Sequence, residues 1–269
     1  MNLALVPAFL ALGAFIGFLA GLLGIGGGFT IVPVLIEIFS REGFAKEHLV
    51  PLAIGTSAAS IMFTGVSSAR AHHGRGGVMW SIVAAMAPGI VLGSLVGPQI
   101  AAALPPALMA AAFGAFIWFG AYRMLRNKPP VASRKLPGRL GMAGMGAVIG
   151  TVAGMVGTGG AFLAVPFMTR CNVRLHVAVG TSAALSIPVA IFAAIGFVFA
   201  GWSKPGLPPL ALGYVYLPAL IGIVVTSTLL APVGARMAHA WPVVRLRYAF
   251  SAMLLSLGAY MWWKAWQLA

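Results

Sequence analysis

The chain has 269 residues, of which 61% are hydrophobic and only 7% are charged, and its mean hydropathy is +1.00. A soluble domain carries roughly 25% charged residues, so this composition excludes a soluble globular protein and predicts an all-α polytopic membrane protein whose apolar surface faces lipid. The net charge of +14 does not indicate a nucleic-acid partner, because the basic residues lie between apolar segments and form no single patch.

Hydrophobic segments follow one another along the chain, five in each half. We expect them over residues 3–23, 26–39, 49–69, 78–103 and 106–125, and then over 140–157, 159–170, 176–200, 210–238 and 243–266. The first segment has no basic region before it, so we interpret it as a membrane segment and not as a cleaved signal peptide. The second segment of each half is too short to cross a bilayer alone, so we expect it to be broken or re-entrant.

The two halves are copies of one unit. The run "GAFIGFLAGLLGIGGGFTIVP" begins at Gly13, and "GAVIGTVAGMVGTGGAFLAVP" begins at Gly146. A second block follows each run, "AIGTSAA" from Ala53 and "AVGTSAA" from Ala178. Recurrence of the blocks in the same order indicates duplication. We therefore predict a first transmembrane repeat over 1–126, a polar linker over 127–139 and a second repeat over 140–269.

The basic residues predict the orientation of the repeats. If every short segment crosses or folds back, thirteen of the 17 Lys and Arg residues gather on one side and four on the other. If each short segment instead continues the helix before it, the split is ten against seven. The stronger bias favours the first arrangement. Each repeat then crosses the membrane an odd number of times, so we predict two antiparallel (inverted) repeats in the inner membrane. The linker would lie in the cytoplasm and both termini outside it.

The two glycine-rich runs are candidate binding elements. The first contains Gly24, Gly26, Gly27 and Gly28, and the second contains Gly157, Thr158, Gly159 and Gly160. A helix that begins at such a break offers free backbone N–H groups and a positive dipole end, which together suit an anion. The alternative is close packing of helices, which we assign to the glycines spaced by four, such as Gly13 and Gly17. No strand precedes the runs, so a nucleotide-binding loop is excluded.

The "GTS" blocks place hydroxyl groups inside apolar helices. The candidates are Thr56, Ser57, Thr181 and Ser182, and each hydroxyl could donate to an oxyanion. The alternative is a hydrogen bond to a carbonyl of the same helix or of an adjacent helix. Both interpretations stay open from the sequence alone.

Few ionisable residues are available for other chemistry. Glu37 lies near Arg41 and is interpreted as a salt bridge or an anchor at the interface. The stretch "RAHHGRGG" from Arg70 is either a solvated basic loop or a vestibule that attracts anions. We find no metal-ligand spacing, no cofactor motif and no catalytic motif, so we predict no metal, no cofactor and no enzyme activity.

The paired "GLLGIGGGFTIVP" and "GMVGTGGAFLAVP", each followed by "GTSAA", resemble the TauE/SafE family of sulfite-exporter-like membrane transporters. The resemblance covers nearly the whole chain. It implies an inner-membrane transporter of sulfite, organosulfonates or related anions, often in the export direction, with the glycine runs and the GTS hydroxyls at the site. Ala161 stands where the first repeat has Gly28, so a site of perfect two-fold symmetry is not expected.

We therefore expect a secondary transporter that exports a small sulfur-containing anion. An anion channel and a non-transporting membrane subunit are the alternatives. The expected partners are the small anionic substrate and the lipid bilayer, with a homodimer left open. An interior potential of −100 mV favours efflux of a monoanion by about 2.3 kcal/mol, so export could run as a uniport without a coupled cation. Coupling to Na⁺ bound by backbone carbonyls stays open as the alternative.

Overall fold

A computed structural model describes residues 5–23, 27–126, 135–238 and 243–269. The helices are α1 (Leu5–Leu23), α2 (Gly28–Arg41), α3 (Lys46–His73), α4 (Trp80–Ala103), α5 (Pro106–Arg126), α6 (Arg139–Val156), α7 (Ala161–Arg170), α8 (Leu175–Gly201), α9 (Leu217–Ala238) and α10 (Val243–Leu268). By length and composition, α3, α4, α5, α6 and α8 can each cross a membrane. The prediction of an all-α polytopic membrane protein is confirmed.

One predicted segment was placed too early. We expected an apolar segment from residue 210, but a hairpin of β1 (Ala211–Leu212) and β2 (Val215–Tyr216) comes first, and α9 begins only at Leu217. The chain turns through Gly213, whose φ is 54°. Apolar side chains in a short hairpin look like part of a membrane helix when only hydropathy is read.

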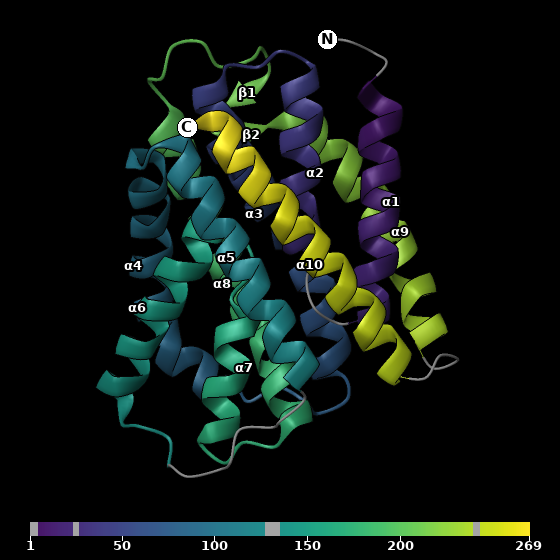
Figure 1. Ribbon diagram of the computed structural model, residues 1–269. Coiled ribbons are helices and arrows are strands. Elements are labelled where there is room, and N and C mark those ends of the chain that lie inside the picture. The colour runs from purple at the N-terminus through teal and green to yellow at the C-terminus, as the bar shows by residue number, and fades with distance from the viewer. Residues whose placement is uncertain (1–4, 24–26, 127–134, 239–242) are drawn as a thin grey trace.

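Each of the two short helices, α2 and α7, runs back toward the end of the molecule at which the preceding helix begins. In Figure 1, α1 descends from the end that holds both termini, and α2 returns to that end. The helix α6 rises from the opposite end, and α7 returns there. We call the first end the termini end. We call the other the basic end, because it collects the C-terminal ends of α3, α5 and α7, with Arg70, Arg75, Arg123, Arg126 and Arg170 on or next to them.

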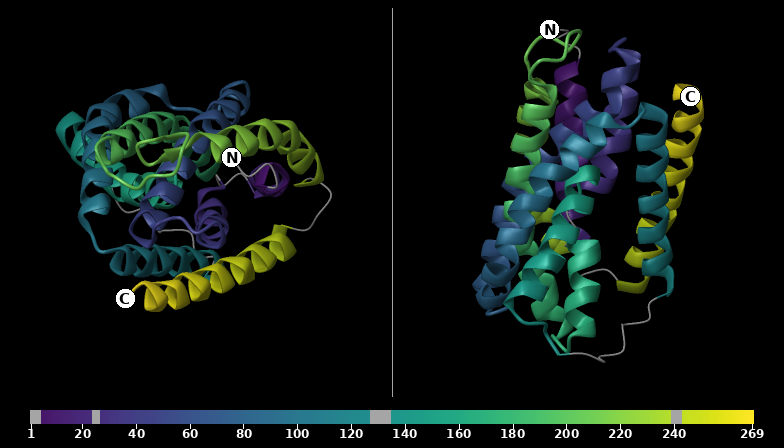
Figure 2. Two further views of the ribbon diagram at one scale, coloured as in Figure 1. Left: turned by 90° about the horizontal axis from the view of Figure 1, so that it is seen from above. Right: turned by 90° about the vertical axis from the view of Figure 1, so that its left-hand side faces the viewer.

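Each of the closest helix pairs joins one helix from each half of the chain. The pairs are α1 with α9, α4 with α6, α5 with α10, and α3 with α8. Figure 2 shows α5 and α10 side by side along one side of the molecule. In the two copies of the repeat, α1 corresponds to α6 and α4 corresponds to α9. The α1–α9 and α4–α6 pairs are therefore equivalent contacts, as a duplicated unit would require. The repeat symmetry itself stays a prediction from the sequence.

Glycines make the α4–α6 contact close. A Cβ added to Gly150 of α6 would lie 2.6 Å from the carbonyl oxygen of Ile90 and 3.0 Å from the backbone nitrogen of Ser94 in α4. A Cβ added to Gly89 or Gly93 of α4 would likewise collide with the carbonyl oxygen of Ala143 or Ala147. The packing interpretation of the glycines spaced by four is therefore confirmed at this interface.

We predict that Gly150→Ala lowers the thermal stability of the purified protein, because its Cβ meets backbone atoms that cannot move aside. Overpacking of this kind costs about 1–3 kcal/mol. Gly144→Ala is the matched control on the same helix, where nothing lies within 4 Å of the added atom. The control should keep or slightly raise the melting temperature, since alanine favours a helix. Equal melting temperatures for the two variants would contradict the close contact.

Candidate functional site

The two glycine breaks, one from each half, meet inside the protein. A Cβ added to Gly28, the first residue of α2, would lie 2.6 Å from the carbonyl oxygen of Gly157 and 3.1 Å from Cα of Thr158. The rings of Phe29 and Phe162, the second residues of α2 and α7, pack edge to face with centroids 4.5 Å apart. The N-termini of the two short helices are therefore neighbours, although their sequences are more than a hundred residues apart.

The second break adopts a backbone conformation that glycine favours. Gly157, Gly159 and Gly160 have φ values of 66°, 65° and 79°. Side chains with a Cβ rarely adopt such values, so the glycines are required for this turn between α6 and α7. The first break is described only from Gly27 onward, and the predicted site residues Gly24 and Gly26 lie outside the described residues.

The second break holds polar groups with no partner among the described residues. The N–H groups of Gly159, Ala161 and Phe162 donate to no described carbonyl or hydroxyl. The hydroxyl of Thr158 also has no hydrogen-bond partner there, and its residue is only 6% exposed. A buried polar group without a partner, such as the Thr158 hydroxyl, costs about 1–3 kcal/mol, so this break is suited to a polar ligand.

Ser57 reaches the same break from α3. Its Oγ donates to the carbonyl oxygen of Gly157 at 3.1 Å, and its side chain is fully buried. Ser186 of α8 lies on the other side, with its Cβ 3.2 Å from a Cβ placed on Gly159. These contacts bring four of the predicted site residues together, namely Gly28, Ser57, Thr158 and Gly159, and place Ser186 beside them.

Each GTS threonine accepts a hydrogen bond from the backbone of the other half of the chain. Thr56 Oγ1 accepts a hydrogen bond from the backbone N–H of Tyr216 at 2.9 Å and donates to the carbonyl of Leu52 at 2.7 Å. Thr181 Oγ1 accepts one from the backbone N–H of Met79 at 3.0 Å. Met79 and Tyr216 immediately precede α4 and α9, the equivalent helices of the two halves.

The glycine of each GTS block completes this contact. Gly55 lies directly against the carbonyl oxygen of Tyr214, and Gly180 against that of Gly77, so that a Cβ at either position would collide with backbone. We call the two contacts the GTS clasps. The clasp of Gly55 and Thr56 holds the hairpin of the second half, and the clasp of Gly180 and Thr181 holds the α3–α4 turn of the first half.

A family model described as Sulfite exporter TauE/SafE matches residues 9–261. The chain belongs to the TauE/SafE sulfite exporter family. It is 34% identical over 257 residues to a "Probable membrane transporter protein" of Haemophilus influenzae, covering 95% of this chain and 97% of the relative. No solved structure matches the chain at a significant level.

More distant relatives carry similar names. The "Probable membrane transporter protein YdhB" of Bacillus subtilis is 25% identical over 242 residues, which cover 87% of this chain and 91% of the relative. The "Probable membrane transporter protein MJ0441" of Methanocaldococcus jannaschii is 24% identical over 265 residues, with 96% of each chain covered. The family and these names point to membrane transport.

Other predicted site residues of this TauE/SafE chain also make packing contacts or bonds within the protein. Gly27 and Gly160 each lie against an isoleucine of the preceding helix, Ile16 and Ile149 respectively. The hydroxyl of Ser182 donates to the carbonyl of Val179 in its own helix at 2.8 Å, and Thr181 belongs to a clasp. These contacts are those of the packing alternative. Anion binding by these residues stays a prediction.

A polar network at the termini end was only partly foreseen. Glu37 forms the expected salt bridge to Arg41, with 2.6 Å between Oε1 and Nε. Tyr260 also donates to Glu37 at 2.7 Å, and the buried Lys264 donates to Ser40 at 2.9 Å. A lysine inside the apolar segment 243–266 was the available signal for this network, which ties α10 to α2. Among the described residues, no group of three His, Cys, Asp or Glu side chains could hold a metal.

We predict that Thr56→Val lowers the thermal stability, because the buried N–H of Tyr216 loses its acceptor. The expected cost is about 1–3 kcal/mol, and Thr56→Ser should restore most of it. Thr228→Val is the matched control, because Thr228 is exposed and bonds only to carbonyls of its own helix. If Thr56→Val instead melts like the wild type and loses sulfite affinity, the threonine contacts the anion and the clasp is wrong.

Proposed function

We propose that this chain is a secondary transporter that exports a small sulfur-containing anion, such as sulfite or an organosulfonate, across the inner membrane. The anion would lie between the N-termini of α2 and α7. The observation that carries this proposal is the second break, where the buried hydroxyl of Thr158 and three backbone N–H groups have no described partner. All four groups are hydrogen-bond donors, as an oxyanion requires.

The surroundings favour a negative charge. The N-terminus of α7 presents the positive end of its helix dipole to the break. The sequence contains only three acids, and Glu37, Glu42 and Glu47 all lie from the later part of α2 to the start of α3, toward the termini end. No carboxylate is therefore placed to repel an anion at the break or to bind a cation beside it.

The distribution of basic residues supports an orientation. The basic end carries the large excess of arginines, so we place it in the cytoplasm. The termini would then face the periplasm. An interior negative by 100 mV favours the outward movement of a monoanion by about 2.3 kcal/mol, which supports export.

The central experiment is sulfite binding to purified Thr158→Val by calorimetry. The variant keeps the shape of the side chain and removes its hydroxyl. A hydrogen bond to a charged group contributes about 1.5–3 kcal/mol, so affinity should fall about tenfold or more. Thr158→Ser should bind nearly as well as the wild type.

Thr169→Val is the control for this experiment, because Thr169 donates only to carbonyls of its own helix. Its affinity for sulfite should not change. If Thr158→Val binds sulfite as tightly as the wild type, the second break is not part of the binding site.

The orientation is tested by thiol labelling. The single cysteine, Cys171, is only 7% exposed, so Cys171→Ser gives a suitable background. In that background, we expect Arg170→Cys at the basic end to react with a membrane-impermeant maleimide only in inverted vesicles. Lys204→Cys at the termini end should react only in intact spheroplasts. The reverse pattern would overturn the orientation and, with it, the argument for export.

A further inference from the structure

We propose that a cavity at the basic end is a second binding site for the transported oxyanion, a vestibule from which the anion reaches the central break. This inference rests on the proposed function. The cavity has a volume of about 430 Å³ and is lined by His72, Arg75, Gly77, Leu175, His176 and Val179. Ligand sites commonly have volumes of about 300–1,000 Å³, so a small oxyanion and part of its hydration shell fit.

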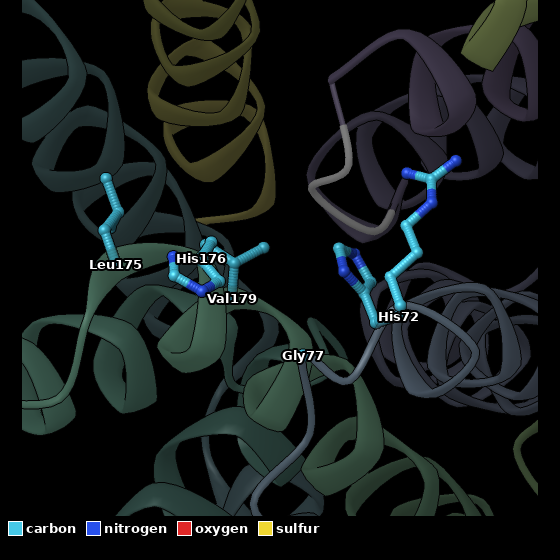
Figure 3. Close-up of a pocket in the computed structure, with 6 residues that line it drawn as sticks. His72, Gly77, Leu175, His176 and Val179 are labelled. Atoms are coloured by element: carbon cyan, nitrogen blue, oxygen red, sulfur yellow. The ribbon is translucent and has the colours of Figure 1, made fainter.

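The lining comes from both halves of the chain. His72 is at the end of α3 and His176 is in the first turn of α8, and Figure 3 shows these two side chains on opposite sides of the cavity. Gly77 forms the wall between them, where it is held against Gly180 by the second GTS clasp. The cavity therefore lies directly over a contact between the two halves.

The charges at this cavity suit an anion. Arg75 is permanently positive, and the two histidines offer ring nitrogens that can donate. The neighbouring titratable groups on the same elements are also basic, namely Arg70 and His73 on α3 and Arg174 before α8. No described acid lies among them, since the three acids of the chain lie from the later part of α2 to the start of α3, toward the other end. A concave surface of one charge concentrates ions of the opposite charge.

One face of α8 connects the cavity with the break. His176 and Val179 line the cavity, and Ser182 and Ser186 follow at spacings of three and four residues, so all four share a helical face. Ser186 lies against Gly159 in the second break. Hydroxyl groups thus continue along this face from the cavity to the proposed central site.

The equivalent position at the termini end is filled. Tyr214 and Tyr216 of the hairpin dock on the first GTS clasp and are only 3% and 4% exposed. The ring of Tyr216 packs on Phe39 and Phe44, with centroids 5.5 Å away in both cases. One clasp is therefore covered by aromatic rings, whereas Gly77 of the other clasp lines the cavity. This asymmetry favours entry of the anion from the basic end.

Calorimetry with sodium sulfite tests this vestibule in the purified full-length protein. The combined variant Arg75→Gln and His176→Gln removes two exposed groups of the cavity and leaves the break intact. At low ionic strength, we expect the affinity of the vestibule for sulfite to be at least fivefold weaker in this variant than in the wild type. Arg139→Gln is the matched control, because it removes one exposed arginine from the same end and does not line the cavity.

Thr158→Val separates this inference from the proposed function. If the vestibule exists, Thr158→Val retains a salt-sensitive sulfite site that disappears when the cavity variant is added. If the cavity variant binds sulfite like the wild type, or if Arg139→Gln weakens binding as much, the vestibule is wrong and the central site stands. If Thr158→Val binds like the wild type while the cavity variant loses binding, the central site fails and the vestibule stands.

Discussion

Close backbone contact between the two halves of the chain is the constraint on which this structure depends. Without a hydrophobic driving force between helices in lipid, association relies on close packing and interhelical hydrogen bonds. The chain meets this requirement with small residues, such as Gly150 against Ile90, and with threonine hydroxyls that bond to backbone of the opposite half. The same contacts bring the two helix breaks together, because Ser57 and Gly28 both reach Gly157.

A helix break inside a membrane protein needs internal partners for its backbone groups. The second break supplies some of them itself, for example the bond of 2.8 Å from the N–H of Gly160 to the carbonyl of Thr158. The donors that remain and the Thr158 hydroxyl lie in the interior of the protein. The basic and acidic side chains lie toward its two ends. This combination gives the membrane transporter a polar centre without burying a charged residue there. The anion site that we propose would therefore consist of the glycine motif and a neutral hydroxyl.

Much of the fold could be predicted from the sequence, because hydropathy and duplication are strong signals in a membrane protein. The expected segments correspond to the helices within a few residues, and the glycine runs mark both breaks. The hairpin at Ala211–Tyr216 was missed, because its apolar residues continue the hydropathy of α9. The partners of Thr56 and Thr181 were not predictable either. A hydroxyl in a helix reveals that it needs a bond, and only the tertiary structure shows that Tyr216 and Met79 provide it. The meeting of Gly28 with Gly157 was expected only in general terms from the proposed two-fold relation.

The most direct test of the account is sulfite efflux from proteoliposomes that contain the purified protein. The account predicts efflux that saturates with internal sulfite, exceeds that of protein-free liposomes and accelerates when the interior is made negative. Efflux that does not saturate would indicate a channel. Efflux no faster than in protein-free liposomes, with protein that is folded and inserted, would contradict the claim that this chain transports sulfite.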